Sequence, residues 1–208
     1  MQRNINLLID DLPDGVQVDG ERYCIATDHR TGLLFEQMLV DPDLTDDEKV
    51  QCALELYYGN SIPLNIEDAL EALLWFYRCG APKPPQPRRS SRNQGGGHSE
   101  RILDYAYDAP YIYAAFLAQY GMDLNAQNNL HWWKFSAMLD GLKEDQVICK
   151  IMSYRALNLR DIKDKDERAR YRRLKARYAL PNTAAIAKKK AIAETLFMQH
   201  EEGANEDS

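Results

Sequence analysis

The sequence predicts a mainly α-helical fold, in which two helical, bundle-like halves with a small N-terminal β-hairpin are joined by a flexible linker rich in proline, glycine and arginine. Three observations carry this prediction. Apolar residues recur at helical spacing between start and stop signals through most of the chain. One short stretch alternates apolar and polar residues around a turn dipeptide. Residues 81–100 hold four prolines, three glycines and three arginines without apolar periodicity.

These patterns divide the chain into four expected parts. An acidic part with the hairpin and several helices covers residues 1–80, and a flexible basic linker covers 81–100. A second helical part covers 101–200, and the polar residues 201–208 form a disordered tail. The sequence leaves open whether the two helical parts pack together.

The hairpin is predicted by the stretch GVQVDGERYCIAT, in which apolar residues alternate on both sides of Asp19-Gly20. This dipeptide accommodates the positive φ angles of a tight hairpin turn. A first helix is expected to start at Asp28 and to bury Leu34, Phe35 and Met38.

Two further helices of the first part carry clear end signals. One opens with Thr45-x-x-Glu48, a capping box in which each side chain satisfies a free backbone N–H of the other residue, and it ends at Gly59. The next has Asn65 as its N-cap and stops before Gly80. Its apolar residues cover much of its circumference, so we expect it at the centre of the first part.

The sequence pattern predicts helices throughout the second part. Its first helix has Pro110 in the first turn, where the missing N–H does no harm, and ends at Gly121. Four more helices are expected, over residues 126–140, 144–155, 164–178 and 183–200.

Charge is distributed unevenly along the 208 residues, whose formal net charge is −6. Residues 1–79 hold 5 Lys and Arg against 16 Asp and Glu, a difference of −11. Residues 163–190 hold 11 basic and 3 acidic residues, a difference of +8. Such contrast suggests partners or self-association steered by charge.

Composition argues for a protein of the cytosol. No apolar run reaches the roughly 18–20 residues of a membrane helix, and the N-terminal apolar stretch is too short for a signal peptide. The cysteines are scattered without a C-x-x-C pair, so reduced thiols are expected rather than disulfides or a zinc site, at Cys24, Cys52, Cys79 and Cys149.

No motif in the sequence indicates catalysis. The four histidines lie far apart, and there is no metalloprotease, nucleophile-elbow, phosphate-loop or dinucleotide-binding signature. The acidic pairs Asp10-Asp11 and Asp46-Asp47 are explained by a turn and by the first turn of a helix. We therefore expect a non-enzymatic protein without a catalytic residue, cofactor or metal site.

The stretch NNLHWWKFSAMLDGL places two tryptophans side by side behind a histidine. On a helix, Trp132 shares an apolar arc with His131 and Phe135, which predicts a core position for Trp132 and a hydrogen-bonded core role for His131. Trp133 falls on the opposite flank, next to Asp140. Packing on another helix of the same part is the favoured interpretation for Trp133, and contact with a protein partner is the alternative.

The helix expected over residues 164–178 is strongly basic, with only Tyr171, Leu174 and Tyr178 as an apolar seam. Basic residues with tyrosines can bind nucleic acid. A solvated face, or docking on the acidic part of a neighbouring copy, is favoured because the chain as a whole is acidic. With Trp133, the candidate partner-binding residues are Arg168, Tyr171, Arg172 and Arg173.

Several stretches together resemble a family of proteins from temperate siphophages and prophages of Gram-positive bacteria, named for a fifteenth phage gene product. They occur in the family's order and cover most of residues 7–181. The matching stretches are NLLIDDLPDGVQVDGERY, DPDLTDDEKVQCALELYYG, EDALEALLWFYRCG, ILDYAYDAPYIYAAFLAQYGMDL, LHWWKFSAMLDGL and KDERARYRRLKARYALP.

The resemblance implies a role in phage tail assembly. Members are typically encoded between the major tail protein and the tape-measure protein, a position that usually belongs to tail assembly chaperones. The implied partners are the tape-measure protein and the tail-tube protein, with a possible homo-oligomer, in the cytoplasm of the bacterial host. A structural virion component, such as a minor tail or connector subunit, is the alternative. A nucleic-acid-binding accessory protein is a third and less favoured hypothesis. Neither nucleic acid nor a membrane is expected as a partner.

Overall fold

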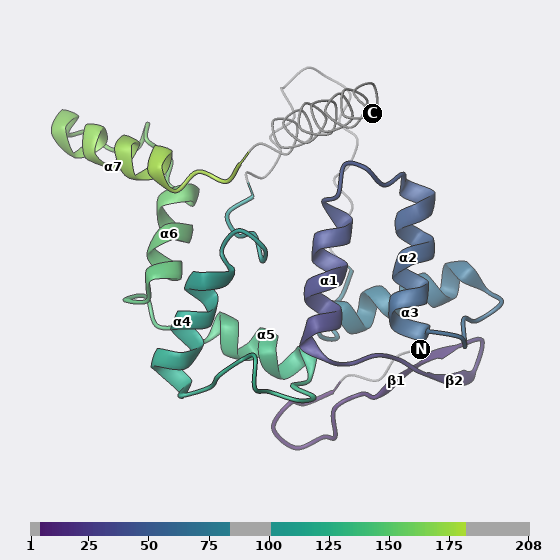
Figure 1. The fold of residues 1–208 in the computed structure, drawn as a ribbon. Helices are drawn as coiled ribbons and strands as arrows, with labels where there is room; N and C mark the ends of the chain where they lie inside the picture. Colours follow the sequence, from purple (N-terminus) through teal and green to yellow (C-terminus); the bar gives the residue numbers. More distant parts are fainter. Residues whose placement is uncertain (1–4, 84–100, 182–208) are drawn as a thin grey trace, which may run out of the picture.

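A computed structural model describes residues 5–83 and 101–181 of the chain, and within these ranges it contains seven helices and one two-stranded antiparallel sheet (Figure 1). The predicted fold class, mainly α with an N-terminal hairpin, is confirmed. Most of the predicted linker, the helix expected over 183–200 and the predicted tail lie outside the described residues. The elements are β1 (Gly15–Val18), β2 (Glu21–Cys24), α1 (His29–Leu39), α2 (Asp46–Tyr58), α3 (Ile66–Tyr77), α4 (Ala109–Tyr120), α5 (Trp132–Asp140), α6 (Val147–Ala156) and α7 (Lys165–Arg177).

The hairpin forms where the sequence predicts it. Asp19 and Gly20 have φ angles of 52° and 83°, both in the left-handed region that a tight turn of this kind requires. The turn pairs Val18 with Glu21 and so sets the register of β1 and β2. Val16 and Val18 are buried, and β1 packs against α3. The hairpin therefore covers one side of the core.

The predicted helix ends are confirmed at α2 and α3. The Thr45 hydroxyl accepts a hydrogen bond from the Glu48 N–H at 3.3 Å, and the Glu48 carboxylate accepts one from the Thr45 N–H at 2.8 Å. Asn65 caps α3 by accepting from the Asp68 N–H. Gly59 ends α2 with a φ of 57°. These local bonds satisfy N–H groups that a helix leaves free at its start.

Phe35 is buried in the core as predicted, but the burial predicted for Leu34 is wrong. Phe35 is 1 % exposed, whereas Leu34 is 53 % exposed. Neighbouring residues on a helix point about 100° apart, and the face of α1 that packs inward contains Gly32 and Phe35. Met38 is half-buried against the same core. Leu34 therefore points away from the contact that Phe35 makes.

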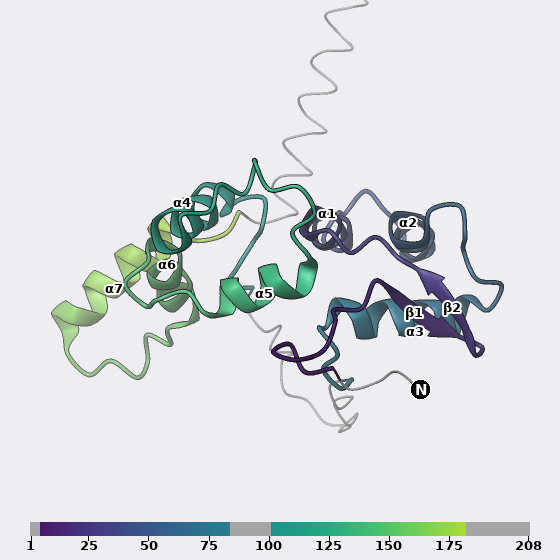
Figure 2. The ribbon, with the colours of Figure 1, turned by 90° about the horizontal axis from the view of Figure 1, so that it is seen from below.

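The two parts of the chain share one hydrophobic core. Figures 1 and 2 place α5 between α4 and the group formed by α1 and α3. The Phe135 ring of α5 stacks on Phe116 of α4 at 5.2 Å and on Trp132 at 5.7 Å. The backbone joins the parts as well, because the His29 N–H donates to the Leu130 carbonyl at 2.7 Å. The question that the sequence left open is therefore answered, since the parts on both sides of residues 84–100 pack together.

A buried ion pair fixes α6 to α4. The Arg155 guanidinium donates to both carboxylate oxygens of Asp108, at 2.6 and 2.8 Å, and both side chains are almost completely buried. Its remaining donors reach the Ile102 carbonyl at 2.9 Å and the Tyr178 carbonyl at 2.6 Å. One side chain thus connects α6 with the segment before α4, the start of α4 and the end of α7.

Replacing Arg155 by alanine should destabilise the protein by about 3–5 kcal/mol, because the Asp108 carboxylate is then left buried without its partner. The double change Arg155→Met and Asp108→Leu removes both charges and should recover much of this loss. Lys150→Ala, at an exposed position of the same helix, should change stability by less than about 0.5 kcal/mol. Urea unfolding measures all three. A loss in Arg155→Ala no larger than that of Lys150→Ala would contradict the role of the pair.

Candidate interaction surfaces

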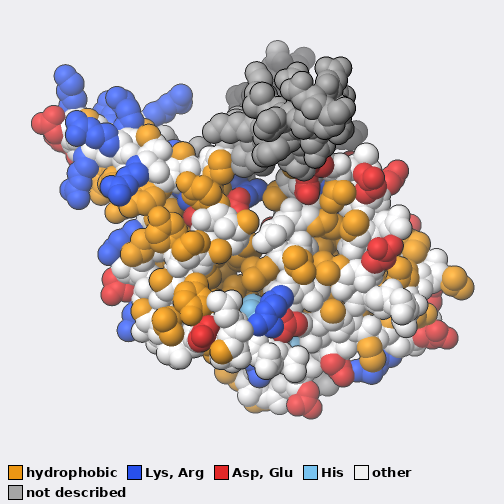
Figure 3. Space-filling view, viewed as in Figure 1, with side chains coloured by type: hydrophobic (Ala, Val, Ile, Leu, Met, Phe, Trp, Pro, Cys, Tyr) orange, Lys and Arg blue, Asp and Glu red, His pale blue; other side chains and the backbone are white. Residues whose placement is uncertain are grey.

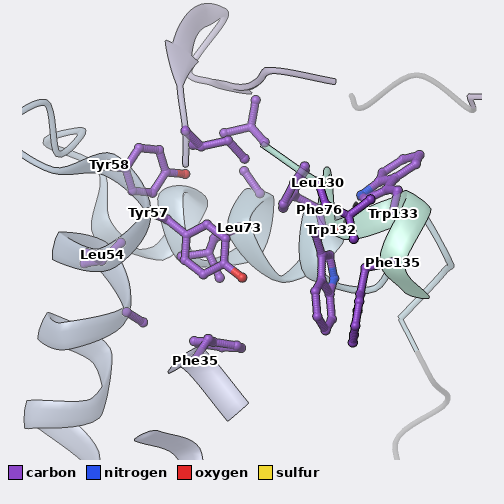
Figure 4. Close-up of a cluster of buried hydrophobic side chains, with 14 of the residues drawn as sticks. Phe35, Leu54, Tyr57, Tyr58, Leu73, Phe76, Leu130, Trp132, Trp133 and Phe135 are labelled. Carbon is purple, nitrogen blue, oxygen red and sulfur yellow. Dashed lines mark hydrogen bonds between the residues drawn. The ribbon is translucent and has the colours of Figure 1, made fainter. Parts of the chain in front are cut away.

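The two neighbouring tryptophans bind the end of α3. The Trp132 Nε1–H donates to the Tyr77 carbonyl and the Trp133 Nε1–H to the Phe76 carbonyl, both at 2.8 Å. Each tryptophan is 3 % exposed, and Figure 4 shows the two indoles together with Phe135 beside Phe76. The last carbonyls of a helix lack the N–H partner that carbonyls in its interior have. The indoles donate to two of these carbonyls, and the Phe76 carbonyl also accepts from the Cys79 N–H at 2.9 Å.

Trp133 lies in the core. The structure therefore supports internal packing, which is the interpretation that the sequence favours for this residue. Its ring packs against Trp75 at 5.6 Å and lies beside Gly80. Trp132 stacks on Tyr77 at 5.4 Å. The tryptophans do occupy different flanks, but α3 and the turn after it cover both. Trp133 therefore offers almost no exposed surface to a partner.

The predicted helix over 126–140 starts later than expected, at Trp132. Asn129 has a φ of 65°, and His131 is extended, with Asp28 opposite it in an isolated antiparallel bridge. The Trp132 N–H donates to the Thr27 carbonyl at 2.7 Å. Pairing with a distant segment therefore keeps residues 128–131 out of the helix, which a pattern within the stretch cannot reveal.

His131 is the N-cap of α5. Its Nδ1 accepts from the Trp133 N–H at 3.1 Å, and its Nε2 lies 3.0 Å from the Pro13 carbonyl. These bonds fit a neutral ring with its proton on Nε2, and burial lowers the pKa of His131. The hydrogen-bonded role predicted for this histidine is confirmed. Among the residues that the structure describes, no group of three or more His, Cys, Asp and Glu is placed to hold a metal ion.

Trp132→Ala and Trp133→Ala should each lower the free energy of unfolding by about 3–5 kcal/mol, since each removes a buried aromatic ring. Trp132→Phe and Trp133→Phe keep most of the ring but each remove one indole hydrogen bond to α3. The Phe76 carbonyl still accepts from the Cys79 N–H at 2.9 Å, so Trp133→Phe should lose about 1 kcal/mol and Trp132→Phe about 1–3 kcal/mol. Leu64→Ala is a control, because Leu64 is completely exposed. Chemical denaturation of the five variants measures these values. A Trp133→Ala protein as stable as the control would show that the ring does not belong to the core.

Acidification should weaken the fold through His131. Because burial lowers its pKa below 6.5, the neutral ring stabilises the fold above pH 6.5, and this stability is lost as the pH falls from 6.5 through the folded-state pKa. Protonation of Nδ1 also removes the acceptor that caps α5. His131→Asn keeps an acceptor at every pH, so its loss of stability between about pH 7.5 and about pH 5.5 should be smaller than that of the wild type. His29, whose pKa burial also lowers, contributes equally in both proteins. Identical pH profiles in urea unfolding would contradict this role.

The basic candidates lie on α7, far from the tryptophans (Figure 1). Arg172 and Arg173 are exposed, and Figure 3 shows Lys and Arg side chains gathered over α7. Arg168 is held within the chain, because its Nε–H donates to the Ile162 carbonyl at 2.8 Å. Tyr171 is half-buried and its ring lies 6.2 Å from that of Tyr154 on α6. The structure thus leaves Arg172 and Arg173 as the accessible members of the candidate set.

An apolar groove of about 400 Å³ was not predicted from the sequence. Its walls come from the segment before α4, the end of α5 and one face of α6, and Asp140 is its one carboxylate. Figure 3 shows hydrophobic side chains over the region where Figure 1 places α4 and α6. No local pattern marks the groove, because three separate segments form it. Its apolar lining residues are Ile102, Leu103, Tyr105, Leu139, Leu142, Ile148, Cys149, Met152 and Ala156.

Comparison with known proteins gives one match. The family model of the Bacteriophage Gp15 protein matches residues 8–180. No curated protein and no solved structure matches the chain. No helix in the described ranges is long and apolar enough to cross a membrane. The family model covers well over half of the sequence and agrees with the ordered resemblance, and the chain therefore belongs to the bacteriophage Gp15 protein family.

Proposed function

We propose that this phage protein acts in tail assembly as a non-enzymatic chaperone that binds the tape-measure protein and recruits the tail-tube protein. The family places the chain among bacteriophage proteins. The proposal of a tail assembly role rests on the gene position typical of such members, and the mode of binding rests on the surface of the protein.

The observation that carries the proposal is the apolar groove beside α6. An amphipathic helix binds a groove of this kind by inserting apolar residues at helical spacing. Met152 lines the groove and is half-buried, and methionine adapts to partner side chains of different shape. A largely helical partner with repeated apolar faces, as expected of a tape-measure protein, matches such a surface.

The exposed arginines of α7 provide a second element of recognition. Arg172 and Arg173 are exposed on α7, which packs against α6. Exposed charges raise the rate of association more than they lower the rate of release. A chaperone that leaves before the tail matures needs such reversible contacts, and many weak copies along one tape measure would hold it through avidity.

Co-expression with the tape-measure protein of the neighbouring gene tests the proposal. A soluble complex with several copies of this chain per tape measure, seen by pull-down and light scattering, is the expected result. Absence from purified virions is expected as well. A tape measure that still aggregates, together with this chain in purified tails, would replace the proposal with a structural virion component.

Met152→Lys should reduce retention of the tape-measure protein by about tenfold or more, because it places a charge in the groove. Val147→Lys is the matched control on the same helix, since Val147 is 52 % exposed and does not line the groove. Both proteins should keep the thermal stability of the wild type to within a few degrees. The two variants are compared by pull-down from equal amounts of purified chain. Equal retention by both would exclude the groove as the binding site.

A further inference from the structure

Within the residues that the structure describes, helix α7 presents an exposed arginine face. None of its 13 residues is buried, and it packs along α6 through a seam that includes Tyr171. Lys175 belongs to this seam, because its Nζ donates to the Arg155 carbonyl at 2.8 Å. The exposed side chains on the rest of the helix are strongly basic and include Arg170, Arg172, Arg173 and Arg177.

A surface of opposite charge lies at the other end of the molecule. The turn between α1 and α2, together with the first turn of α2, covers residues 41–48 and holds five acidic residues and no basic one. Asp46 and Asp47 are exposed at the start of α2. Leu39 and Val40, which precede the turn, are exposed apolar side chains. We call residues 39–48 the acidic tip.

The acidic tip and α7 cannot meet within one chain. Figures 1 and 2 both place α7 at one end of the molecule, beyond α6, and the α1–α2 turn on the other side of α5. The core fixes this separation, because α5 is packed between α1 and α4. A contact between the two surfaces therefore has to join two molecules.

We propose that α7 of one copy docks on the acidic tip of a second copy. The arginines of α7 face Asp46 and Asp47, and Leu39 and Val40 meet the edge of the Tyr171 seam. A second copy is the occupant that fits, because every molecule carries both complementary surfaces in equal number. The contact shares Arg172 and Arg173 with the tape-measure proposal but does not depend on it, since it uses neither the groove nor a second protein.

The contact has two consequences for the assembly. It joins two different surfaces, so one contact leaves one surface free on each copy. Those free surfaces can pair with each other in a two-fold dimer, or with further copies in rings or chains. It consists mainly of exposed charges, so salt should weaken it strongly. Self-association should therefore be reversible and dependent on both protein concentration and ionic strength.

Charge reversal on each surface tests the contact in the full chain. Variant A carries Arg172→Glu and Arg173→Glu, and variant B carries Asp46→Lys and Asp47→Lys. At about 50 mM NaCl the wild type should form dimers or larger species in analytical ultracentrifugation, and at about 500 mM it should dissociate. The association of each variant alone should be weaker than that of the wild type by a factor of about ten or more. An equimolar mixture of A and B should associate again, because each reversed surface then meets its complement.

The double variant Lys143→Glu and Lys150→Glu is the control for net charge. It changes the charge by the same amount as variant A at two exposed positions outside α7, and it should associate like the wild type. Circular dichroism establishes that each variant is folded. A wild type that is monomeric at low salt, a variant A that associates unchanged, or wild-type assemblies that nuclease treatment abolishes would overturn the proposal. The last result would instead assign α7 to nucleic acid.

Discussion

Two indole N–H groups at the start of α5 donate to the last two carbonyls of α3, and the arrangement of both parts of the chain depends on these bonds. They bring residues 132 and 133 into the core formed by α1, α2 and α3. The position of Trp132 then requires a glycine on α1, because a Cβ at Gly32 would lie 2.2 Å from the indole ring. Phe135 extends the same aromatic cluster to α4. A single short helix thus holds the two parts together.

From α4 onward, a polar interaction rather than the aromatic cluster holds the helices against one another. The Arg155–Asp108 pair orients α6 against the start of α4, and its bond to the Tyr178 carbonyl positions the end of α7. Since no residue of α7 is fully buried, its placement follows from this buried guanidinium and the tyrosine seam. The fully buried core therefore ends at α6, and the groove and the arginine face both lie at its margin, where partners can reach them.

Local signals in the sequence predicted local structure well. The Asp19-Gly20 turn, the Thr45–Glu48 capping box and the glycine at the end of α4 each determine their own backbone, so nearby residues suffice to recognise them. The failures arose from distant contacts. The start of α5 depends on Thr27 and Asp28, a hundred residues away in sequence.

The candidate surface was predicted less completely than the fold, for the same reason. A helical projection placed Trp132 and Trp133 on different flanks, but only the position of α3 decides that both flanks are covered. Exposure of Arg172 and Arg173 followed from the composition of α7. The groove draws on three segments that are separate in the sequence, so no single segment reveals it.

The bonds between α5 and α3 also set an order of events during synthesis of the chain. When residues 5–83 have left the ribosome, the Phe76 and Tyr77 carbonyls have no indole donor, and the aromatic side chains around them lack their cover. The N-terminal part can complete its core only after residue 135 has emerged, because Trp132, Trp133 and Phe135 come from the later part. Contacts of such long sequence separation form late and slow folding. The N-terminal part should therefore complete its core only after α5 has emerged rather than as an independent first stage, and a fragment ending before α5 should be prone to aggregate.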